Sequence, residues 1–248
     1  MKRLDQALVE RGLFESREKA KRAVMAGVVS VNGQLARKGS DNIKPADEIT
    51  VKQADKYVSR GGLKLEPALE HFGIDPSGQV AVDLGASTGG FTDCLLQKGA
   101  RQVFAVDVGH GQLAWKLRQD ERVIVMEKTN ARDLTPESFP QPFTPFPLAV
   151  IDCSFISLRK ILPPAVALMS TGGKLIALVK PQFEAGKAEA DKGKGVITDP
   201  AIHRRVLQEL QDFVTDELPG ARWTGTTESP LKGPAGNKEF FALIEKET

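Results

Sequence analysis

Two lysines and two carboxylates stand where apolar segments of the chain begin or end. Asp152 ends the apolar run LAVID, and Lys180 ends the apolar run KLIALVK, just before a proline. Lys64 lies in SRGGLKL, and Glu239 lies in NKEFF, where another apolar run begins. A lysine ammonium can stabilise negative charge developing on an oxygen, and a desolvated, neutral lysine can remove a proton. Taken singly, a charge at a strand end is more often a solvated terminus, and the alternative for Lys64, on the first helix after the linker, is a surface helix residue. A catalytic interpretation therefore rests on the four together.

These residues need a scaffold that brings their segments to one edge. Strand-like stretches occur at 80–84, 103–108, 123–126, 148–152, 174–179 and 240–244, and helix-like stretches at 63–72, 92–98, 113–120, 161–169 and 201–217. This alternation predicts an α/β fold, a mostly parallel sheet with helices on both faces. Residues 222–244 hold two strand-like stretches with no helix between them, which predicts an antiparallel last strand. Ligands bind at the carboxyl ends of such parallel strands.

The most informative motif is VAVDLGASTGGFT at 80–92, an apolar strand followed by a glycine-rich turn and a helix. Its spacing is neither GxGxxG nor GK[ST], which disfavours dinucleotides and nucleoside triphosphates. Asp107 ends the next strand and is placed to accept hydrogen bonds from a ribose. These residues alone leave a dehydrogenase and a methyltransferase open.

Residues 1–56 have the pattern of a small separate domain. The spacing predicts two helices, the second over 17–26, then a strand at 28–31 and a hairpin turn at Asn32-Gly33. Residues 1–60 hold 13 Lys/Arg against 8 Asp/Glu, and the remaining residues hold 21 against 24. A basic surface on such a domain is typical of RNA binding. The candidate RNA-binding residues are Arg3, Arg17, Lys19, Lys21, Arg22, Arg37 and Lys38.

Composition excludes several classes of protein. The 248 residues are 41% hydrophobic and 27% charged, which is ordinary for a folded domain. The two cysteines, Cys94 and Cys153, form no CxxC motif and no Cys/His cluster, so we expect neither a disulfide scaffold nor a metal site. No apolar run reaches the roughly 20 residues of a membrane span. The first residues lack the apolar segment of a signal peptide, so we expect a cytoplasmic protein without a membrane partner.

Several motifs resemble known families. Residues 3–34 are similar to the RNA-binding domain of the ribosomal protein S-four type, and DLGASTGG resembles the S-adenosylmethionine loop of class I methyltransferases, with Ser-Thr where FtsJ-like enzymes usually have Ala-Pro. The residues Lys64, Asp152, Lys180 and Glu239 match the Lys-Asp-Lys-Glu tetrad of FtsJ-like 2′-O-methyltransferases. With KYVSRGGLKL, IDCSFISL and LVKPQFE, the chain resembles the TlyA family over nearly its full length.

This resemblance implies a function and a role for each residue. It implies S-adenosylmethionine as cofactor, the 2′-hydroxyl of cytidine in ribosomal RNA as substrate, and ribosomal RNA or ribosomal subunits as partners. Lys180 would act on the hydroxyl, Asp152 would orient Lys180, and Lys64 with Glu239 would position the ribose. The resemblance gives cofactor-binding roles to Asp83, Gly85, Ser87, Gly89, Gly90 and Asp107. Asn130 and Ala131 are its candidates for the adenine end of the cofactor.

Alternative hypotheses remain at the level of sequence. Cys153 beside Asp152 raises a 5-methylcytosine enzyme, but Asp-Cys-Ser-Phe lacks the expected Pro-Cys. The haemolysin label of the family raises a membrane-lytic protein, and a third alternative is a non-catalytic RNA-binding protein.

The expected domains are 1–56 for RNA binding and 63–248 for methyl transfer, joined by a linker at 57–62. The polar segment 187–195 is expected to be a loop beside the site, either plainly solvated or an RNA-contacting lid.

Overall fold

The computed structural model describes residues 1–52 and 55–247, and the chain divides into two compact units, Met1–Asp55 and Lys56–Thr248. The division lies close to the expected boundary. Residues 57–62, however, do not form the expected linker, because they pack within the second unit. Tyr57 is 2% exposed, and its ring packs so closely on Gly62 that a Cβ there would lie 2.2 Å from it. The first helix of this unit begins at Arg60, earlier than expected.

The first unit is a small α+β domain, as predicted. Ser16 caps the second helix, since its side chain accepts a hydrogen bond from Lys19 N. Asn32 and Gly33 both have positive φ, 50° and 78°, which is the geometry of the predicted hairpin turn. Its core is formed by apolar side chains from both helices and the strands around them. The elements are β1 (Lys2–Arg3), α1 (Leu4–Glu10), α2 (Arg17–Met25), β2 (Val29–Val31), β3 (Gln34–Leu35), β4 (Asn42–Ile43) and β5 (Ile49–Val51).

The described part of the second unit contains a seven-stranded sheet with the order β11-β12-β10-β9-β6-β7-β8. The five strands from β10 to β8 are parallel, and β12 is antiparallel to both of its neighbours. This arrangement confirms the predicted α/β fold and its antiparallel end. The strands are β6 (Val80–Leu84), β7 (Gln102–Val106), β8 (Val123–Met126), β9 (Phe146–Ile151), β10 (Met169–Val179), β11 (Ala221–Glu228) and β12 (Phe240–Lys246).

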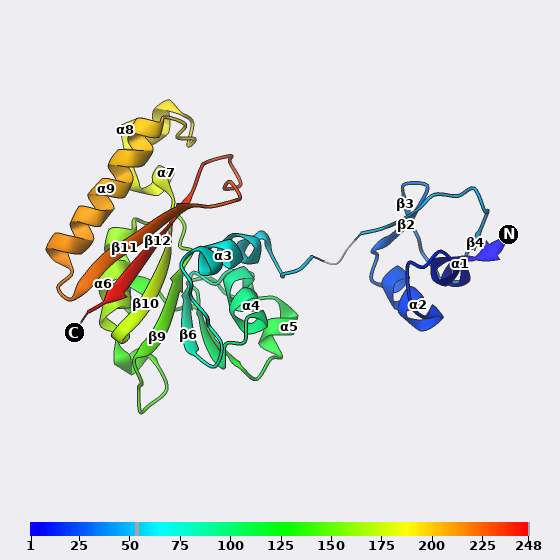
Figure 1. Cartoon of the computed structure of the whole chain (residues 1–248), viewed down its shortest axis with the longest axis horizontal. Helices are drawn as coiled ribbons and strands as arrows, with labels where there is room; N and C mark the ends of the chain where they lie inside the picture. The colour runs from blue at the N-terminus through cyan, green and yellow to red at the C-terminus, as the bar shows by residue number, and fades with distance from the viewer. Residues whose placement is uncertain (53–54, 248) are drawn as a thin grey trace. The chain divides into compact units, whose positions relative to one another are not determined.

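Helices cover both faces of this sheet (Figure 1). Strand side chains alternate between two cores, so that Leu148 and Val150 pack under α3 and α4, while Ala149 and Ile151 pack against α6 and α9. The segment 187–195, expected to be a loop, includes the short helix α8. The helices are α3 (Arg60–His71), α4 (Gly90–Gln97), α5 (Trp115–Arg118), α6 (Leu162–Ala167), α7 (Pro181–Glu184), α8 (Lys187–Lys192) and α9 (Pro200–Glu217), with 3-10 turns η1 (Ala131–Asp133), η2 (Pro136–Ser138) and η3 (Leu158–Lys160).

Candidate active site and RNA-binding surface

The four residues singled out for chemistry line one cavity of about 240 Å³. Asp152 directly follows β9 and Lys180 directly follows β10, so parallel pairing brings both to the same edge. Because β12 runs antiparallel to β10, with Phe240 opposite Val179, its first residues lie at that edge too, and Glu239 precedes it. Lys64 reaches the cavity from α3. The sequence prediction that these residues lie together agrees with this geometry.

Lys64 and Glu239 form a buried ion pair. Lys64 Nζ donates to Glu239 Oε2 at 2.6 Å, and the two side chains are 9% and 1% exposed. Burying two charges is costly, and each charge then depends on the other for compensation. The pair therefore fixes a polar wall of the cavity in one place.

Lys180 and Asp152 form a second pair at the neighbouring carboxyl ends of β10 and β9. Lys180 Nζ lies 2.5 Å from Asp152 Oδ1 and donates a hydrogen bond to Ser154 Oγ at 2.8 Å. Ser154 was not anticipated from the sequence, although its place two residues after Asp152 puts it on the same loop. Pro181 opens α7 and ends β10, so the lysine is held at the strand terminus.

The N-terminal end of α3 also lines this cavity, through Ser59, Arg60 and Gly61. The sequence analysis assigned these residues to a linker and missed them. Ser59 caps α3 by accepting from Gly61 N, and Arg60 donates to the carbonyl of Lys232 at 2.6 Å. The signal was present in the sequence, because Ser-Arg-Gly-Gly before an apolar run is a helix start.

A second cavity of about 490 Å³ continues from the first and shares Gly85, Ser87, Asp152 and Ser154 with it. Asp107, Asn130 and Ala131, three of the residues that the sequence analysis named as cofactor candidates, also line it. The Asp107 carboxylate accepts from Ser87 N at 2.7 Å and from Gly109 N at 2.6 Å. These contacts fix the carboxylate at the side of the cavity.

Glycines shape the turn between the two cavities. Gly85 has φ +88°, and a Cβ there would lie 2.7 Å from the carbonyl oxygen of Asp152. At Gly90 a Cβ would lie 2.2 Å from Ser59 Oγ, so α3 and α4 can approach closely only with glycine there. Gly89 has a different role, since its Cβ would meet Leu117 of α5, and Gly89 lines neither cavity.

Asp83 also lies outside both cavities. It is 0% exposed beneath the glycine turn, and it accepts a hydrogen bond from Thr92 Oγ at 2.7 Å. Burial, more than the nearby charge of Asp152, raises the pKa of Asp83 to about 7. Its placement is that of a support for the turn rather than of a ligand-binding residue.

Cys153 is placed as an inert thiol. Its Sγ lies 3.5 Å from the carbonyl oxygen of Leu84, and burial raises the pKa of the thiol to about 12. A cysteine nucleophile acts as the thiolate, so this environment disfavours base methylation through Cys153.

The seven basic residues proposed for RNA binding divide into four that form ion pairs and three for which the described residues provide none. Arg3, Arg17 and Lys21 surround Asp5, with nitrogens 2.9, 3.1 and 4.0 Å from its Oδ2. Asp5 is 0% exposed, and its hydrogen bond from Arg3, followed by that from Arg17, lowers its pKa to about 2. The three cations stay about half-exposed. Lys19 pairs with Glu15.

Arg22, Arg37 and Lys38 form the second group. They are exposed, and within residues 1–52 and 55–247 none of them has an ion-pair partner. The first unit thus presents cations that are prearranged around Asp5 and others that are unengaged.

Comparison with known proteins agrees with both units. The model described as FtsJ-like methyltransferase matches residues 57–246, and the model described as S4 domain matches residues 2–49. Hemolysin A of Brachyspira hyodysenteriae is 42% identical over 97% of this chain and 98% of its own length. In the described residues, no helix has the length and apolar character needed to cross a membrane.

Two further relatives cover nearly the whole chain. The 16S/23S rRNA (cytidine-2′-O)-methyltransferase TlyA of Mycobacterium tuberculosis is 43% identical over 99% of this chain and 90% of its own length. A solved structure from Streptococcus thermophilus that bears a hemolysin name is 46% identical, with a TM-score of 0.74, over 99% of this chain and 88% of that one. The chain therefore belongs to the FtsJ-like methyltransferase family, in its TlyA branch with an amino-terminal S4 domain.

Proposed function

We propose that the protein methylates the 2′-hydroxyl of cytidine in ribosomal RNA with S-adenosylmethionine as methyl donor. The observation that carries this proposal is the convergence of Lys64, Asp152, Lys180 and Glu239 on one cavity that opens into a second, nucleoside-sized one. The relative from Mycobacterium tuberculosis bears the name of that activity. A ribosomal substrate would place the reaction in the cytoplasm.

The residues of the second cavity fit the cofactor. Asp107 would accept the ribose hydroxyls, because each carboxylate oxygen now accepts one backbone N–H and retains capacity for another donor. Asn130 and Ala131 would face the adenine, beside the apolar Val108 and Ile156. Gly85 leaves space between the cavities. The bound cofactor would supply a methyl group on a positively charged sulfur.

The first cavity would hold the ribose and act on its hydroxyl. A ribose hydroxyl is a poor nucleophile, so the chain must orient it and assist the loss of its proton. Lys180 would meet the oxygen, where an ammonium stabilises developing negative charge and a neutral amine takes up the proton. Asp152 and Ser154 hold Lys180 in place, and the Lys64–Glu239 pair would position the sugar.

The first unit would supply affinity for RNA. Its exposed cations can contact phosphates, and such contacts strengthen binding with little dependence on sequence. The partner would be ribosomal RNA, either free or within a ribosomal subunit.

The test is methyl transfer to ribosomal subunits from a strain that lacks the gene. Purified protein with S-adenosylmethionine should add a methyl group to a cytidine 2′-oxygen, detected by nuclease mapping and mass spectrometry. Methylation of a base would overturn the proposal. RNA binding without methyl transfer would favour a non-catalytic RNA-binding protein, and leakage of liposomes caused by the pure protein would favour the membrane-lytic alternative.

A further inference from the structure

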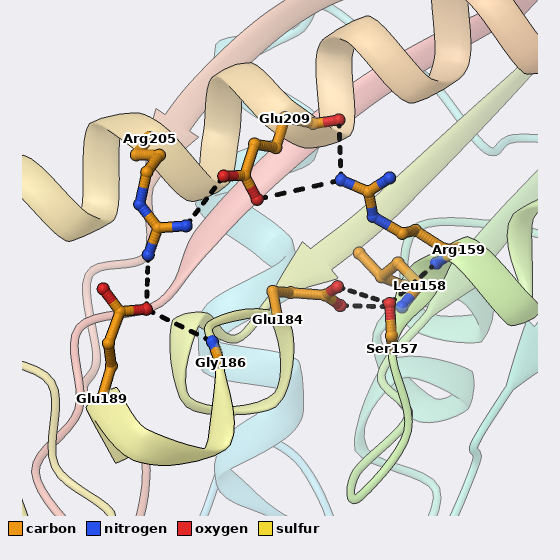
Figure 2. A network of polar contacts seen from close by, with 8 residues as sticks. All are labelled: Ser157, Leu158, Arg159, Glu184, Gly186, Glu189, Arg205 and Glu209. Atoms are coloured by element: carbon orange, nitrogen blue, oxygen red, sulfur yellow. Dashed lines mark hydrogen bonds and ion pairs between the residues drawn. The ribbon is translucent and has the colours of Figure 1, made fainter. Parts of the chain in front are cut away.

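Glu184 connects the two loops that carry Asp152 and Lys180. It ends α7, which begins directly after Lys180. Its carboxylate accepts hydrogen bonds from Ser157 Oγ at 2.6 Å and from Leu158 N at 2.7 Å (Figure 2). Ser157 and Leu158 stand at the start of η3, immediately after the loop that follows Asp152.

The loop after Asp152 is held at two points with a strained residue between them. At one point Lys180 contacts Asp152 and Ser154, and at the other Glu184 binds Ser157 and Leu158. Phe155 lies between these points with φ +63°, which is unfavourable for a side chain of its kind. A strained backbone persists only where its surroundings determine it, and these contacts hold the chain on both sides of Phe155.

Glu184 receives these two bonds in a largely buried position. Burial raises the pKa of its carboxyl group, and the two donors act against that rise. Both donors belong to the same turn, and Leu158 is buried in the core at 3% exposure. The carboxylate therefore anchors α7 to a rigid part of the second unit.

A second, exposed connection runs parallel to the first. Arg159 of η3 contacts Glu209 on α9, Arg205 bridges Glu209 to Glu189, and Glu189 accepts from Gly186 N at the start of α8 (Figure 2). Exposed ion pairs contribute little and weaken with salt. This network provides a natural comparison, because it links η3 to α9 and α8, beside the Glu184 connection, through exposed side chains.

We propose that Glu184 is a positioning residue that sets the distance between the Asp152 loop and Lys180 through its two hydrogen bonds to Ser157 and Leu158. This inference rests on the proposed function, since it concerns the geometry of the same reaction. Glu184 lines neither of the two cavities, so it would touch neither substrate nor cofactor. Its effect passes through the loop to the Lys180–Asp152 pair.

The test compares Glu184→Ala, Glu184→Gln and Ser157→Ala with the control Arg205→Ala. In Glu184→Ala the single-turnover rate with saturating cofactor and RNA should fall about 10- to 100-fold, because small misplacements of catalytic groups are costly. Affinities for S-adenosylmethionine and RNA should stay within about threefold of wild type, because that loop fixes reactive geometry more than binding. Ser157→Ala keeps the bond from Leu158 N to Glu184, so its single-turnover rate should lie between those of the wild type and Glu184→Ala.

The conservative variant distinguishes geometry from charge. In Glu184→Gln, Oε1 can accept from Leu158 N and Nε2 can donate to Ser157 Oγ, so the rate should return to within about threefold of wild type. Arg205→Ala should retain the wild-type rate. Val123→Ala, in the outermost strand β8 and away from both cavities, controls for a general loss of stability. A wild-type rate in Glu184→Ala, or an equal loss in Glu184→Gln, would overturn the proposal.

A second readout separates this proposal from the proposed function. Hydrogen exchange at the Leu158 amide should be at least about tenfold faster in Glu184→Ala than in wild type or Arg205→Ala, because the amide loses its acceptor and its turn opens locally. If the wild-type protein showed no methyl transfer, the proposed function would be refuted. Hydrogen exchange at the Leu158 amide would still test whether Glu184 holds the turn at Ser157 and Leu158. Unchanged exchange in Glu184→Ala would refute the connection whatever the activity. If Glu184→Ala does not fold, the single-turnover rates of Ser157→Ala and Arg205→Ala carry the test, and a wild-type rate in Ser157→Ala would then overturn the proposal.

Discussion

Replacing Lys64 by methionine should lower the free energy of unfolding of the second unit by about 3–5 kcal/mol. The reason is the burial of its partner, since Glu239 lies 2.6 Å away and is 1% exposed. Methionine is an unbranched side chain one atom shorter than lysine, and it removes the ammonium group with its charge and its hydrogen-bond donors. The carboxylate of Glu239 would then be buried without compensation. Glu239→Leu should cost a similar amount, because it leaves the Lys64 ammonium unpaired.

The double variant Lys64→Met/Glu239→Leu tests whether the pair acts as a unit. With both charges removed and apolar groups in their place, stability should return to within about 1–2 kcal/mol of wild type. The two single penalties would therefore be strongly non-additive. All three variants should lose RNA methylation, because the cavity loses the polar groups that are proposed to position the ribose.

Urea denaturation followed by tryptophan fluorescence is a suitable assay. The chain has two tryptophans, Trp115 and Trp223, and both belong to the second unit, so their signal follows that unit alone. A loss below about 1 kcal/mol in Lys64→Met, as for an exposed pair, would refute a buried ion pair. Additive single and double losses would refute the coupling.

Cofactor binding, the buried Asp83 and the role of the first unit can each be tested with one variant. Asp107→Ala should weaken S-adenosylmethionine binding about 10- to 100-fold by calorimetry, since hydrogen bonds to a charged acceptor are lost, whereas the exposed Asp133→Ala should not. Asp83→Asn should stabilise the protein at pH 8 by about 2–4 kcal/mol and far less near pH 4. The pKa of Asp83 in the folded protein, about 7, lies above its value in the unfolded chain, so the stability of the wild type falls as the pH rises from the unfolded to the folded pKa. Parallel profiles of stability against pH for the two proteins would contradict this. Deleting residues 1–55 should preserve folding and cofactor binding but lower methylation at low RNA concentration; a full rate there would contradict the division of labour.

The sequence predicted the position of the strand-end residues because their signal is local. Apolar runs that end in Asp152 and Lys180 identify buried strands whose carboxyl ends meet at one edge, and the structure has them there. To place Glu239 at the same edge, the sequence analysis needed one more prediction, that the last strand runs antiparallel to its neighbours. Ser154 was missed because its contact with Lys180 depends on the conformation of a loop, which periodicity does not report.

Other assignments depended on the direction of side chains. Asp83 belongs to the glycine-rich motif, but side chains alternate along a strand, and position 83 faces Thr92 beneath α4. Among the basic residues of the first unit, the count of charges was visible, but the sharing of Asp5 by Arg3 and Arg17 was not. Such pairings arise from how two helices pack, which sequence spacing alone does not determine.

Lys180 is proposed to act on the ribose hydroxyl, and the single-turnover rate of Lys180→Ala is the measurement that decides whether it does. With saturating S-adenosylmethionine and RNA, the rate should fall about 10²- to 10³-fold while both affinities stay close to wild type. Lys180→Arg should not restore it, because a planar guanidinium neither fits the place of an ammonium nor gives up its proton. Lys160→Ala, which removes an exposed lysine of η3, should keep the full rate. A near-normal rate in Lys180→Ala would contradict the assignment of the four residues and with it the proposed methylation of ribose.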